Sequence, residues 1–374
     1  MREPAYELFL FVRGVCLSKH KVLVTADMAA INFSLDIVRC SLVGWALHML
    51  VWGRLNSLSR PLAASSFVFR VFHPASLEAH AIVNLGIVVA VILAAIFVVV
   101  AGIILFALMR FRWREGEPDP RQFAGSRRIE LVWTAIPLVI VVTLFSMTAR
   151  TMSISDPPPA PSPDLILIGH QWWWEIRYPK TSVVTANEIH IPVGRQLLVR
   201  LDSADVLHEF WVPELGRKMT AVPGHPNQIW IEADHAGTYL GVCSEFCGTE
   251  HAWMRFLVVA EAQAQFDAWE KAQLAPAETP RAGDAAKGLA FLQQESCRSC
   301  HAINGTLASA GVGPDLTHFA SRKQFGGGIA ENTPENLRRW LEDPQQVKPG
   351  VLMPNFKLTS EQITQLVAYF ETLK

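Results

Sequence analysis

Charged residues are scarce in this chain, and neither sign dominates. Of its 374 residues, 18% are Asp, Glu, Lys or Arg and 50% are hydrophobic, and the formal net charge is −1. No basic stripe occurs, which argues against a nucleic-acid partner. Neither a nucleophile triad nor a phosphate-binding glycine loop is evident. The length suggests two or three domains, and the composition indicates that part of the chain lies in a membrane.

Charge is missing altogether from two long stretches. Residues 81–109 contain no charged side chain, and as a helix these 29 residues would span about 43 Å. A second uncharged run covers residues 131–149 and contains Pro137, which neighbouring helices can accommodate. Both runs are long enough for a ~30 Å hydrocarbon core. The sequence therefore predicts a two-helix membrane anchor within residues 71–156.

The segment between these runs is rich in arginine. The positive-inside rule places such a segment in the cytoplasm, so everything after the second run is expected outside it. For a bacterial protein this means a multi-pass inner-membrane protein with a periplasmic C-terminal part. The arginines are Arg110, Arg112, Arg114, Arg121, Arg127 and Arg128.

The first 70 residues are the least informative. Their one apolar run, residues 41–53, is short for a spanning helix. It fits the hydrophobic region of an overlong signal peptide, or translation starts later than Met1; a third span is less favoured. Sequencing the mature N-terminus separates these interpretations, since a start before residue 40 contradicts the first two.

Cysteine is used in motifs, and no pair is clearly left for a structural disulfide. In Cys243-Ser-Glu-Phe-Cys247-Gly-Thr-Glu-His251-Ala-Trp-Met254, two thiols, an imidazole and a thioether fall within twelve residues. Soft sulfur with imidazole favours copper, with zinc as the alternative, over hard cations, and one thiolate more than a blue-copper site needs allows two ions to be bridged. His208 is the best candidate for a second imidazole. The alternative is a Cys243–Cys247 disulfide, which leaves His251 and Met254 unexplained.

Short apolar runs surround this motif, separated by Gly and Pro. Their spacing predicts a β-sandwich or barrel of about 100 residues, after a stiff proline-rich spacer that begins at residue 157. We place this domain at residues 157–262. The expected strands are residues 164–168, 188–191, 196–201, 228–231, 237–241 and 254–259.

A second domain follows a linker at residues 263–282, whose first part, through Leu274, is expected to be helical. Cys297-Arg-Ser-Cys300-His301 is the haem c attachment motif, and no second Cys or Cys/His pair follows to complete a zinc site. After His301 only His318 and Met353 offer a sixth ligand. Met353 precedes an expected helix at residues 359–373, and we predict that Met353 binds iron while His318 lies at the surface. This domain is placed at residues 283–374.

From about residue 70 onward the chain resembles subunit II of haem–copper cytochrome c oxidases. The pattern His…Cys-x-Glu-x-Cys-x3-His-x2-Met resembles their dinuclear CuA centre, and every position is filled. The last domain resembles class I cytochromes c at residues 288–291, 313–316 and 353–354. The implied fold is multidomain: a two-helix transmembrane hairpin, a β-sandwich cupredoxin domain and an all-α class I cytochrome c domain, as in caa-type oxidases.

The resemblance also implies roles for three further residues. The main-chain carbonyl of Glu245 would bind one copper, and its carboxylate would bind magnesium at the interface with subunit I. Trp172, the first of three tryptophans where the family usually has Trp-Tyr-Trp, would admit electrons to the copper site. Glu130 would stand at the entrance of a proton pathway, although the residues alone favour an interfacial carboxylate paired with Arg127 or Arg128.

The implied function is electron transfer from a donor, through haem c and the dinuclear copper, to subunit I. Subunit I would reduce oxygen to water and pump protons, with subunit III as a further partner and a soluble or membrane cytochrome c, or another carrier, as donor. The alternative is a free-standing membrane-anchored electron carrier or copper-delivery protein, which would purify without a large polytopic subunit. A second alternative keeps the architecture but pairs it with a nitric oxide or nitrous oxide reductase.

Overall fold

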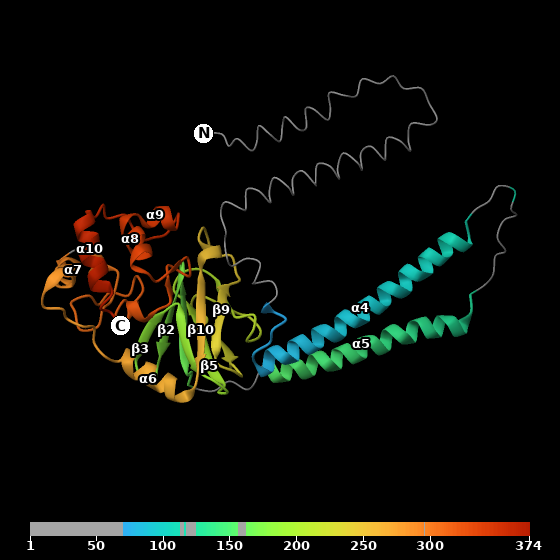
Figure 1. Ribbon diagram of the computed structural model, residues 1–374. Coiled ribbons are helices and arrows are strands. Elements are labelled where there is room, and N and C mark those ends of the chain that lie inside the picture. Colours follow the sequence, from blue (N-terminus) through green and yellow to red (C-terminus); the bar gives the residue numbers. More distant parts are fainter. Residues whose placement is uncertain (1–69, 113–115, 117–124, 156–161, 295) are drawn as a thin grey trace, which may run out of the picture. The chain divides into compact units, whose positions relative to one another are not determined.

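The computed structural model describes residues 70–112, 116, 125–155, 162–294 and 296–374 (Figure 1). The predictions for the N-terminal segment, apart from its residue 70, lie outside these residues. So do Arg114, Arg121 and the proline-rich spacer through residue 161.

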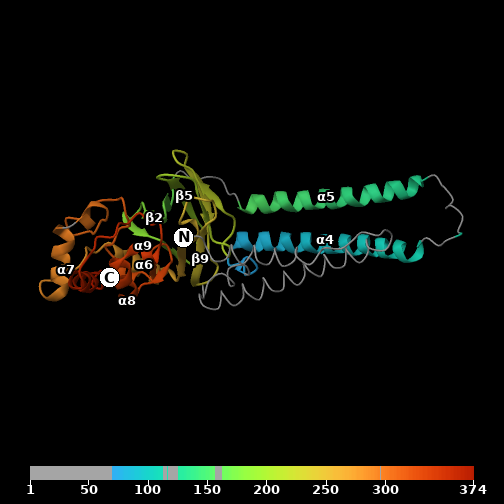
Figure 2. The ribbon, with the colours of Figure 1, turned by 90° about the horizontal axis from the view of Figure 1, so that it is seen from above.

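Two long apolar helices precede the folded domains. They are α4 (Leu77–Arg110) and α5 (Arg127–Ser155), with mean hydropathies of 3.4 and 2.1 in windows that are not buried. Figures 1 and 2 both show them side by side and antiparallel. Ser76 Oγ accepts the N–H of Ala79 at 3.0 Å and so caps α4. Both predicted runs are confirmed as helices long enough to cross a bilayer, and Pro137 is accommodated inside α5.

A β-sandwich follows, here called the β domain (residues 162–261). Its two five-stranded sheets have the orders β3-β2-β1-β5-β8 and β4-β10-β9-β6-β7. The first sheet consists of β1 (Leu165–His170), β2 (Trp173–Tyr178), β3 (Val183–Ala186), β5 (Leu197–Ser203) and β8 (Asn227–Ile231). The second consists of β4 (Glu188–Pro192), β6 (His208–Trp211), β7 (Met219–Ala221), β9 (Gly237–Cys243) and β10 (Arg255–Glu261).

The core between the sheets is built around three aromatic side chains. Trp174 packs edge-on against Phe210 and Phe256, and all three are at most 1% exposed. Each of the six predicted runs coincides with a strand. Strands β2, β3, β6 and β7 were not predicted, because they are short or carry charged residues among the apolar ones.

A helix, α6 (Gln263–Gln273), opens the predicted linker, as expected. It belongs structurally to the β domain, because Phe266 and Trp269 pack against Tyr178 and the Trp269 ring stacks on His190 at 4.0 Å. Such ring contacts hold the first half of the linker in place.

The last part of the chain, here called the C-terminal domain (residues 283–374), is mainly helical. Helices α7 (Gly283–Gln294) and α10 (Ser360–Phe370) cross closely at Gly288, where a side chain would run into the backbone of Gln365. The remaining elements are α8 (Pro334–Glu342), α9 (Pro344–Val347), the short helices η2 (Ser296–Ser299) and η3 (Phe319–Ser321), and the strands β11 (Gln324–Phe325) and β12 (Ala330–Glu331).

The prediction that His318 lies at the surface is wrong. Its side chain is buried, with Nδ1 2.6 Å from the carbonyl oxygen of Lys374 and Nε2 3.0 Å from that of Gln273. The His318 ring therefore links Lys374 to the last residue of α6. Both of its ring nitrogens face carbonyl oxygens, so neither is free to bind a metal.

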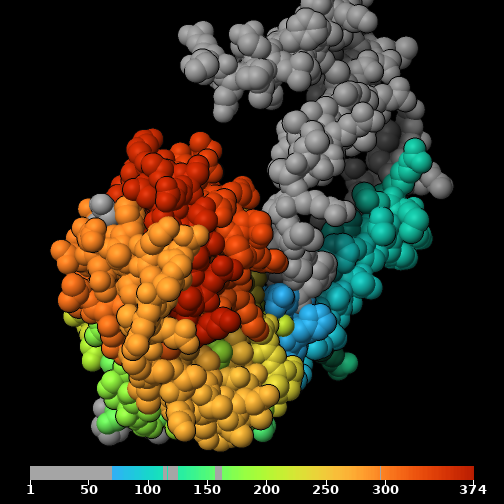
Figure 3. Space-filling view, turned by 60° about the vertical axis from the view of Figure 1, so that its left-hand side comes forward, coloured from blue at the N-terminus to red at the C-terminus, as the bar shows by residue number. Residues whose placement is uncertain are grey.

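The C-terminal domain lies directly against the β domain (Figure 3). The Glu188 carboxylate accepts the backbone N–H groups of Lys323 and Gln324 at 2.5 and 3.3 Å, and Lys323 Nζ donates to Thr238 Oγ1 at 2.8 Å. Burial of Glu188, which is 3% exposed, raises its pKa. Backbone groups thus take part directly in joining the two domains.

Candidate functional site

Five side chains from separate elements of the β domain meet at one end of the second sheet. His208 begins β6 and Cys243 ends the neighbouring β9, with Phe210 paired to Cys243. Cys247 lies in the loop after β9, His251 begins the short helix η1 (His251–Trp253), and Met254 follows it directly. Both cysteines and Met254 are buried in the hydrophobic core of the domain.

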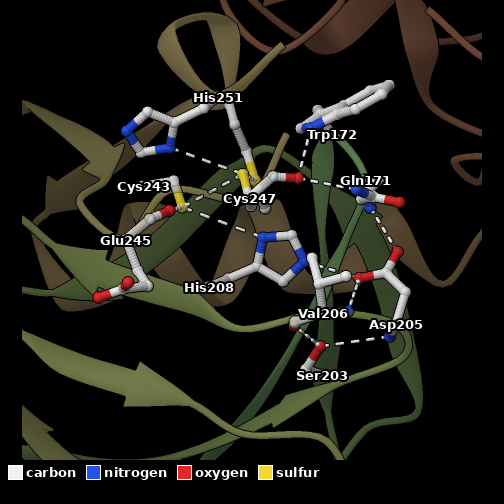
Figure 4. Close-up of polar contacts among 11 residues, drawn as sticks. Gln171, Trp172, Ser203, Asp205, Val206, His208, Cys243, Glu245, Cys247 and His251 are labelled. Atoms are coloured by element: carbon white, nitrogen blue, oxygen red, sulfur yellow. Dashed lines mark hydrogen bonds and ion pairs between the residues drawn. The ribbon is translucent and has the colours of Figure 1, made fainter. Parts of the chain in front are cut away.

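The ligand atoms form a compact group around the two sulfurs (Figure 4). Cys243 Sγ lies 3.8 Å from Cys247 Sγ and 3.9 Å from His208 Nδ1. Cys247 Sγ lies 3.6 Å from His251 Nδ1 and 3.7 Å from Met254 Sδ. Each imidazole thus faces a different sulfur, which is the arrangement that two bridging thiolates with one imidazole on each side require.

His208 is held in its orientation by neighbours that the sequence did not single out. Its Nε2 lies 2.8 Å from Asp205 Oδ1, so Nδ1 points at Cys243. Its ring needs the space above Gly169 on β1, where a Cβ would lie 2.6 Å from the ring. An acid on the far nitrogen is the usual way to fix a ligating histidine. The i, i+3 spacing of Asp205 and His208 was the signal available in the sequence.

The two thiols titrate as a pair. The hydrogen bond between them lowers the pKa of Cys243 to about 4; burial opposes this effect, and a smaller contribution from the His208 hydrogen bond adds to it. The same hydrogen bond raises the pKa of Cys247. Burial alone would lower the pKa of His208, but its bonds to Cys243 and Asp205 raise it. The surroundings of Cys243 therefore favour its thiolate, which is the ligating form.

The residues fit copper and do not form a disulfide. Both cysteines are free, and their sulfurs are 3.8 Å apart against roughly 2.05 Å in a disulfide. His208, Cys243 and Cys247 place their ligand atoms within 4.8 Å of one another. Two cysteine sulfurs, two imidazoles and a thioether form a soft donor set that selects copper over hard cations.

Two of the predicted residues keep their carboxylates away from this group. The carbonyl oxygen of Glu245 is 3.2 Å from Cys243 Sγ, while its carboxylate points away from the sulfurs and is exposed (Figure 4). Phe246 beside it is 76% exposed. Glu130 lies in the first turn of α5 and takes no part in the cluster.

A cavity opens between the two domains, and the predicted haem ligands line it. Cys297, Cys300, His301 and Met353 face this cavity. Helix η2 carries Cys297, and the backbone N–H groups of Cys300 and His301 both bond to the Cys297 carbonyl, which brings these three side chains together. The apolar part of the lining includes Phe319, Phe325, Leu337, Leu341, Leu366 and Phe370.

The predicted axial ligands are oriented by hydrogen bonds. His301 Nδ1 donates to the Pro314 carbonyl at 2.8 Å, which leaves Nε2 as the nitrogen able to bind iron. Burial lowers the pKa of His301, so the ring is neutral as ligation requires. Met353 Sδ accepts a hydrogen bond from Trp340 Nε1 at 3.3 Å. A Cβ at Gly313 would lie 2.7 Å from the His301 ring, so glycine is needed there.

The polar atoms of the cavity fit haem as well. Arg322 Nε and Gln324 Nε2 are buried and have no hydrogen-bond partner among the described residues, and both side chains line the cavity. Buried donors without partners are costly, and the two propionates of a haem would supply the acceptors. Neither residue was identified from the sequence.

Trp172 connects the two sites. Its indole lines the cavity, and its Nε1 donates to the Cys247 carbonyl at 3.0 Å. Gln171 Nε2 donates to the same carbonyl at 2.7 Å, while the Gln171 backbone N–H bonds to Asp205 (Figure 4). Of the three consecutive tryptophans only Trp174 is fully buried.

Comparisons with known proteins match the chain in three parts. The description "Cytochrome C oxidase subunit II, transmembrane domain" matches residues 64–148, "Cytochrome C oxidase subunit II, periplasmic domain" residues 180–262, and "Cytochrome c" residues 285–374. Among solved structures, the periplasmic domain of subunit II of cytochrome oxidase (CoxB) of Bradyrhizobium japonicum covers 31% of this chain and 95% of its own, with 29% identity and a TM-score of 0.30.

Relatives that match along most of the chain are bacterial oxidase subunits. Cytochrome c oxidase subunit 2 of Alkalihalophilus pseudofirmus is 36% identical over 292 residues, covering 76% of this chain and 84% of the relative. The subunits 2 of Bacillus sp. (strain PS3) and Bacillus subtilis (strain 168) are 34% and 31% identical, covering 71% and 73% of this chain and 80% and 82% of the relatives. These matches favour an oxidase subunit over a free-standing carrier.

The matched domains imply dinuclear copper and haem c, and membership implies assembly with subunit I in a bacterial membrane. The chain belongs to the family of cytochrome c oxidase subunit II, in a form with a C-terminal cytochrome c domain, and is an electron-transfer subunit of the oxidase.

Proposed function

We propose that this subunit passes electrons from its C-terminal domain to its β domain through Trp172, and then on to subunit I. Bound haem and copper supply the one-electron carriers. Cys297 and Cys300 attach the haem, and His301 and Met353 bind its iron. The residues proposed to bind copper are His208, Cys243, Cys247, His251 and Met254, with the main-chain carbonyl of Glu245.

One observation carries this proposal. The Trp172 indole faces the cavity that holds Cys297, Cys300, His301 and Met353, and its N–H touches the main chain of Cys247. A single aromatic side chain therefore bridges the haem cavity and the copper cluster. Trp172 is thus proposed as the residue through which electrons reach the copper.

Composition and spectra of the isolated chain test the ligand assignments. We expect two copper ions and one haem per chain, with the haem retained on a denaturing gel because thioether bonds are covalent. The oxidised spectrum should show the sulfur-to-iron band of methionine ligation, which accompanies a high potential. One copper or none would contradict the dinuclear site, and a missing band would exclude Met353.

Further partners belong to the same proposal. The exposed Glu245 carboxylate is proposed to bind Mg²⁺ with ligands from subunit I, since hard oxygen ligands suit this ion. Metal analysis of the assembled oxidase should then find magnesium, and less of it in Glu245→Gln.

Subunit III and a cytochrome c or similar donor are proposed to complete the system. Covalent haem attachment would also support an extracytoplasmic location of the C-terminal domain, which the arginines between the two membrane spans indicate.

Glu130 is proposed to admit protons to subunit I. It lies at the start of α5, exposed, next to the arginine-rich segment. A Glu130→Gln variant removes the titratable group, and we expect turnover of the assembled oxidase to fall by about tenfold or more, as for other lost proton-transfer groups. The copper and haem spectra should not change. Turnover equal to that of the unmodified enzyme would leave Glu130 as an interfacial carboxylate.

A further inference from the structure

Lys348 is a buried cation at the junction of the β domain and the C-terminal domain. It follows α9 directly and is only 2% exposed. Its Nζ donates to the Gly326 carbonyl at 2.9 Å in the C-terminal domain, and to the Trp253 and Trp172 carbonyls at 3.2 and 3.4 Å in the β domain. A lysine ammonium has three N–H donors, so each has a carbonyl partner.

The position of this ammonium is strongly determined. Burial lowers the pKa of Lys348 to about 8, with the Glu250 carboxylate opposing the effect. A buried charge is tolerated only where hydrogen bonds replace its water, and here three main-chain oxygens do so. Main-chain carbonyls cannot swing away as side chains can, so they hold Nζ at one place between the domains.

A run of three glycines lets the two backbones meet beside Lys348. Gly326, Gly327 and Gly328 have φ values of 64°, 75° and 80°, a region that side chains disfavour. A Cβ at Gly327 would collide with the Trp253 carbonyl and lie 3.1 Å from Lys348 Nζ. The Arg255 N–H donates to the Gly327 carbonyl at 3.0 Å. The C-terminal domain therefore contacts the loop of the copper ligands through its main chain.

The carbonyls that Lys348 binds belong to residues that matter for electron transfer. One is that of Trp172 itself, and another is that of Trp253, immediately before Met254. Lys348 also lines the haem cavity. We propose that Lys348 is a positioning residue, whose three hydrogen bonds fix Trp172 and the Met254 loop relative to the haem cavity for electron transfer. This inference rests on the proposed function.

The interface offers a matched control. Lys323 also joins the two domains through its ammonium, which donates to Thr238 Oγ1 at 2.8 Å, but it bonds to neither Trp172 nor Trp253. A Lys323→Met variant removes an interdomain hydrogen bond of the same kind, away from the Trp172 backbone. It separates weakened docking in general from misplacement of Trp172.

The test measures electron transfer inside the assembled oxidase. A photochemical reductant delivers one electron to haem c, and the haem and near-infrared copper bands are followed in time. Lys348→Met keeps an unbranched side chain that is one atom shorter and loses the N–H donors. We expect about tenfold slower transfer to copper, because a shift of about 1 Å in a reacting pair can cost that much or more. Reduction of the haem and both static spectra should not change.

Lys348→Arg, which keeps charge and donors, should recover most of the rate, and Lys323→Met should transfer at the unmodified rate. Equal haem-to-copper rates in Lys348→Met and the unmodified oxidase would overturn the positioning role of Lys348 and leave the proposed function untouched. If Lys348→Met does not assemble, Lys348→Gln is measured instead, because its side chain is one atom shorter and its amide has only two N–H donors for the three carbonyls. We expect slower transfer there too, and an unmodified rate would overturn the proposal that three hydrogen bonds from one ammonium fix Trp172. An unmodified oxidase whose haem never reduces its copper would instead overturn the proposed function.

Discussion

A Cys247→Ser variant is expected to bind at most one copper ion per chain instead of two. Cys247 Sγ lies 3.6 Å from His251 Nδ1, 3.7 Å from Met254 Sδ and 3.8 Å from Cys243 Sγ, so it is the atom that all of them share. A serine hydroxyl does not ionise at neutral pH and is a hard donor. Electron delivery to subunit I should fall by at least about 100-fold, since losing even an outer partner of a metal site costs 10–100-fold.

Ser244→Ala is the matched control for this variant. Ser244 lies in the same loop, but its hydroxyl donates to Glu209 Oε2 at 2.7 Å and does not face the sulfurs. The control should keep two coppers and the near-infrared absorption of a shared site. Two coppers and an unmodified spectrum in Cys247→Ser would contradict the dinuclear assignment. Copper analysis with electron paramagnetic resonance distinguishes these results.

The local part of both sites was predictable from the sequence. The ligands from Cys243 to Met254 lie within one loop and one turn, and Cys297 to His301 within another, so their spacing alone indicates chemistry. His208 was the distant candidate in the copper cluster, and the structure brings it to the cluster because β6 and β9 are neighbours in one sheet. The two membrane helices were equally clear, since uncharged runs of this length are typical of membrane spans and rare in soluble domains.

Apart from Asp205, which stands three residues before His208, the groups that support the candidate ligands could not be predicted. Lys348 and Trp172 are 176 residues apart in sequence, and nothing local marks either as a partner of the other. Arg322 has the sequence surroundings of an ordinary surface arginine, yet it is buried beside the haem cavity. His318 was misplaced for the same reason, because its partners Gln273 and Lys374 lie 45 and 56 residues away. Such contacts depend on how whole domains pack.

The docking of the C-terminal domain has a consequence for the electron donor. Trp172 is only partly exposed and lines the haem cavity, and Gly327 and Lys348 of the C-terminal domain lie against its main-chain carbonyl. In this arrangement the C-terminal domain lies against Trp172, so an external carrier is expected to reduce the haem rather than the copper. The covalent link keeps the haem domain at high effective concentration beside its acceptor.

A Trp172→Leu variant is therefore expected to slow transfer from haem to copper by about 100-fold, the size of effect that lost positioning of a reacting pair produces. Leucine removes both the ring that lines the cavity and the N–H that bonds to the Cys247 carbonyl at 3.0 Å. Reduction of the haem by the external donor should proceed at the unmodified rate. The measurement follows the haem and copper bands after a rapid electron pulse into the assembled oxidase.

The neighbouring Trp173 is the control for this prediction, because it lines the same cavity but stacks on His170 at 4.3 Å and makes no bond to the copper loop. Trp173→Leu should leave the haem-to-copper rate within about twofold, as expected for a contact outside the reacting pair. Trp172→Phe, which keeps a ring but no N–H, should fall between Trp172→Leu and the unmodified oxidase. Equal slowing by Trp172→Leu and Trp173→Leu would mean that the packing of the cavity matters and that Trp172 is no special route. Slowing by Trp172→Leu alone, with both static spectra unchanged, assigns the route to the one indole that touches the cavity and the cluster together.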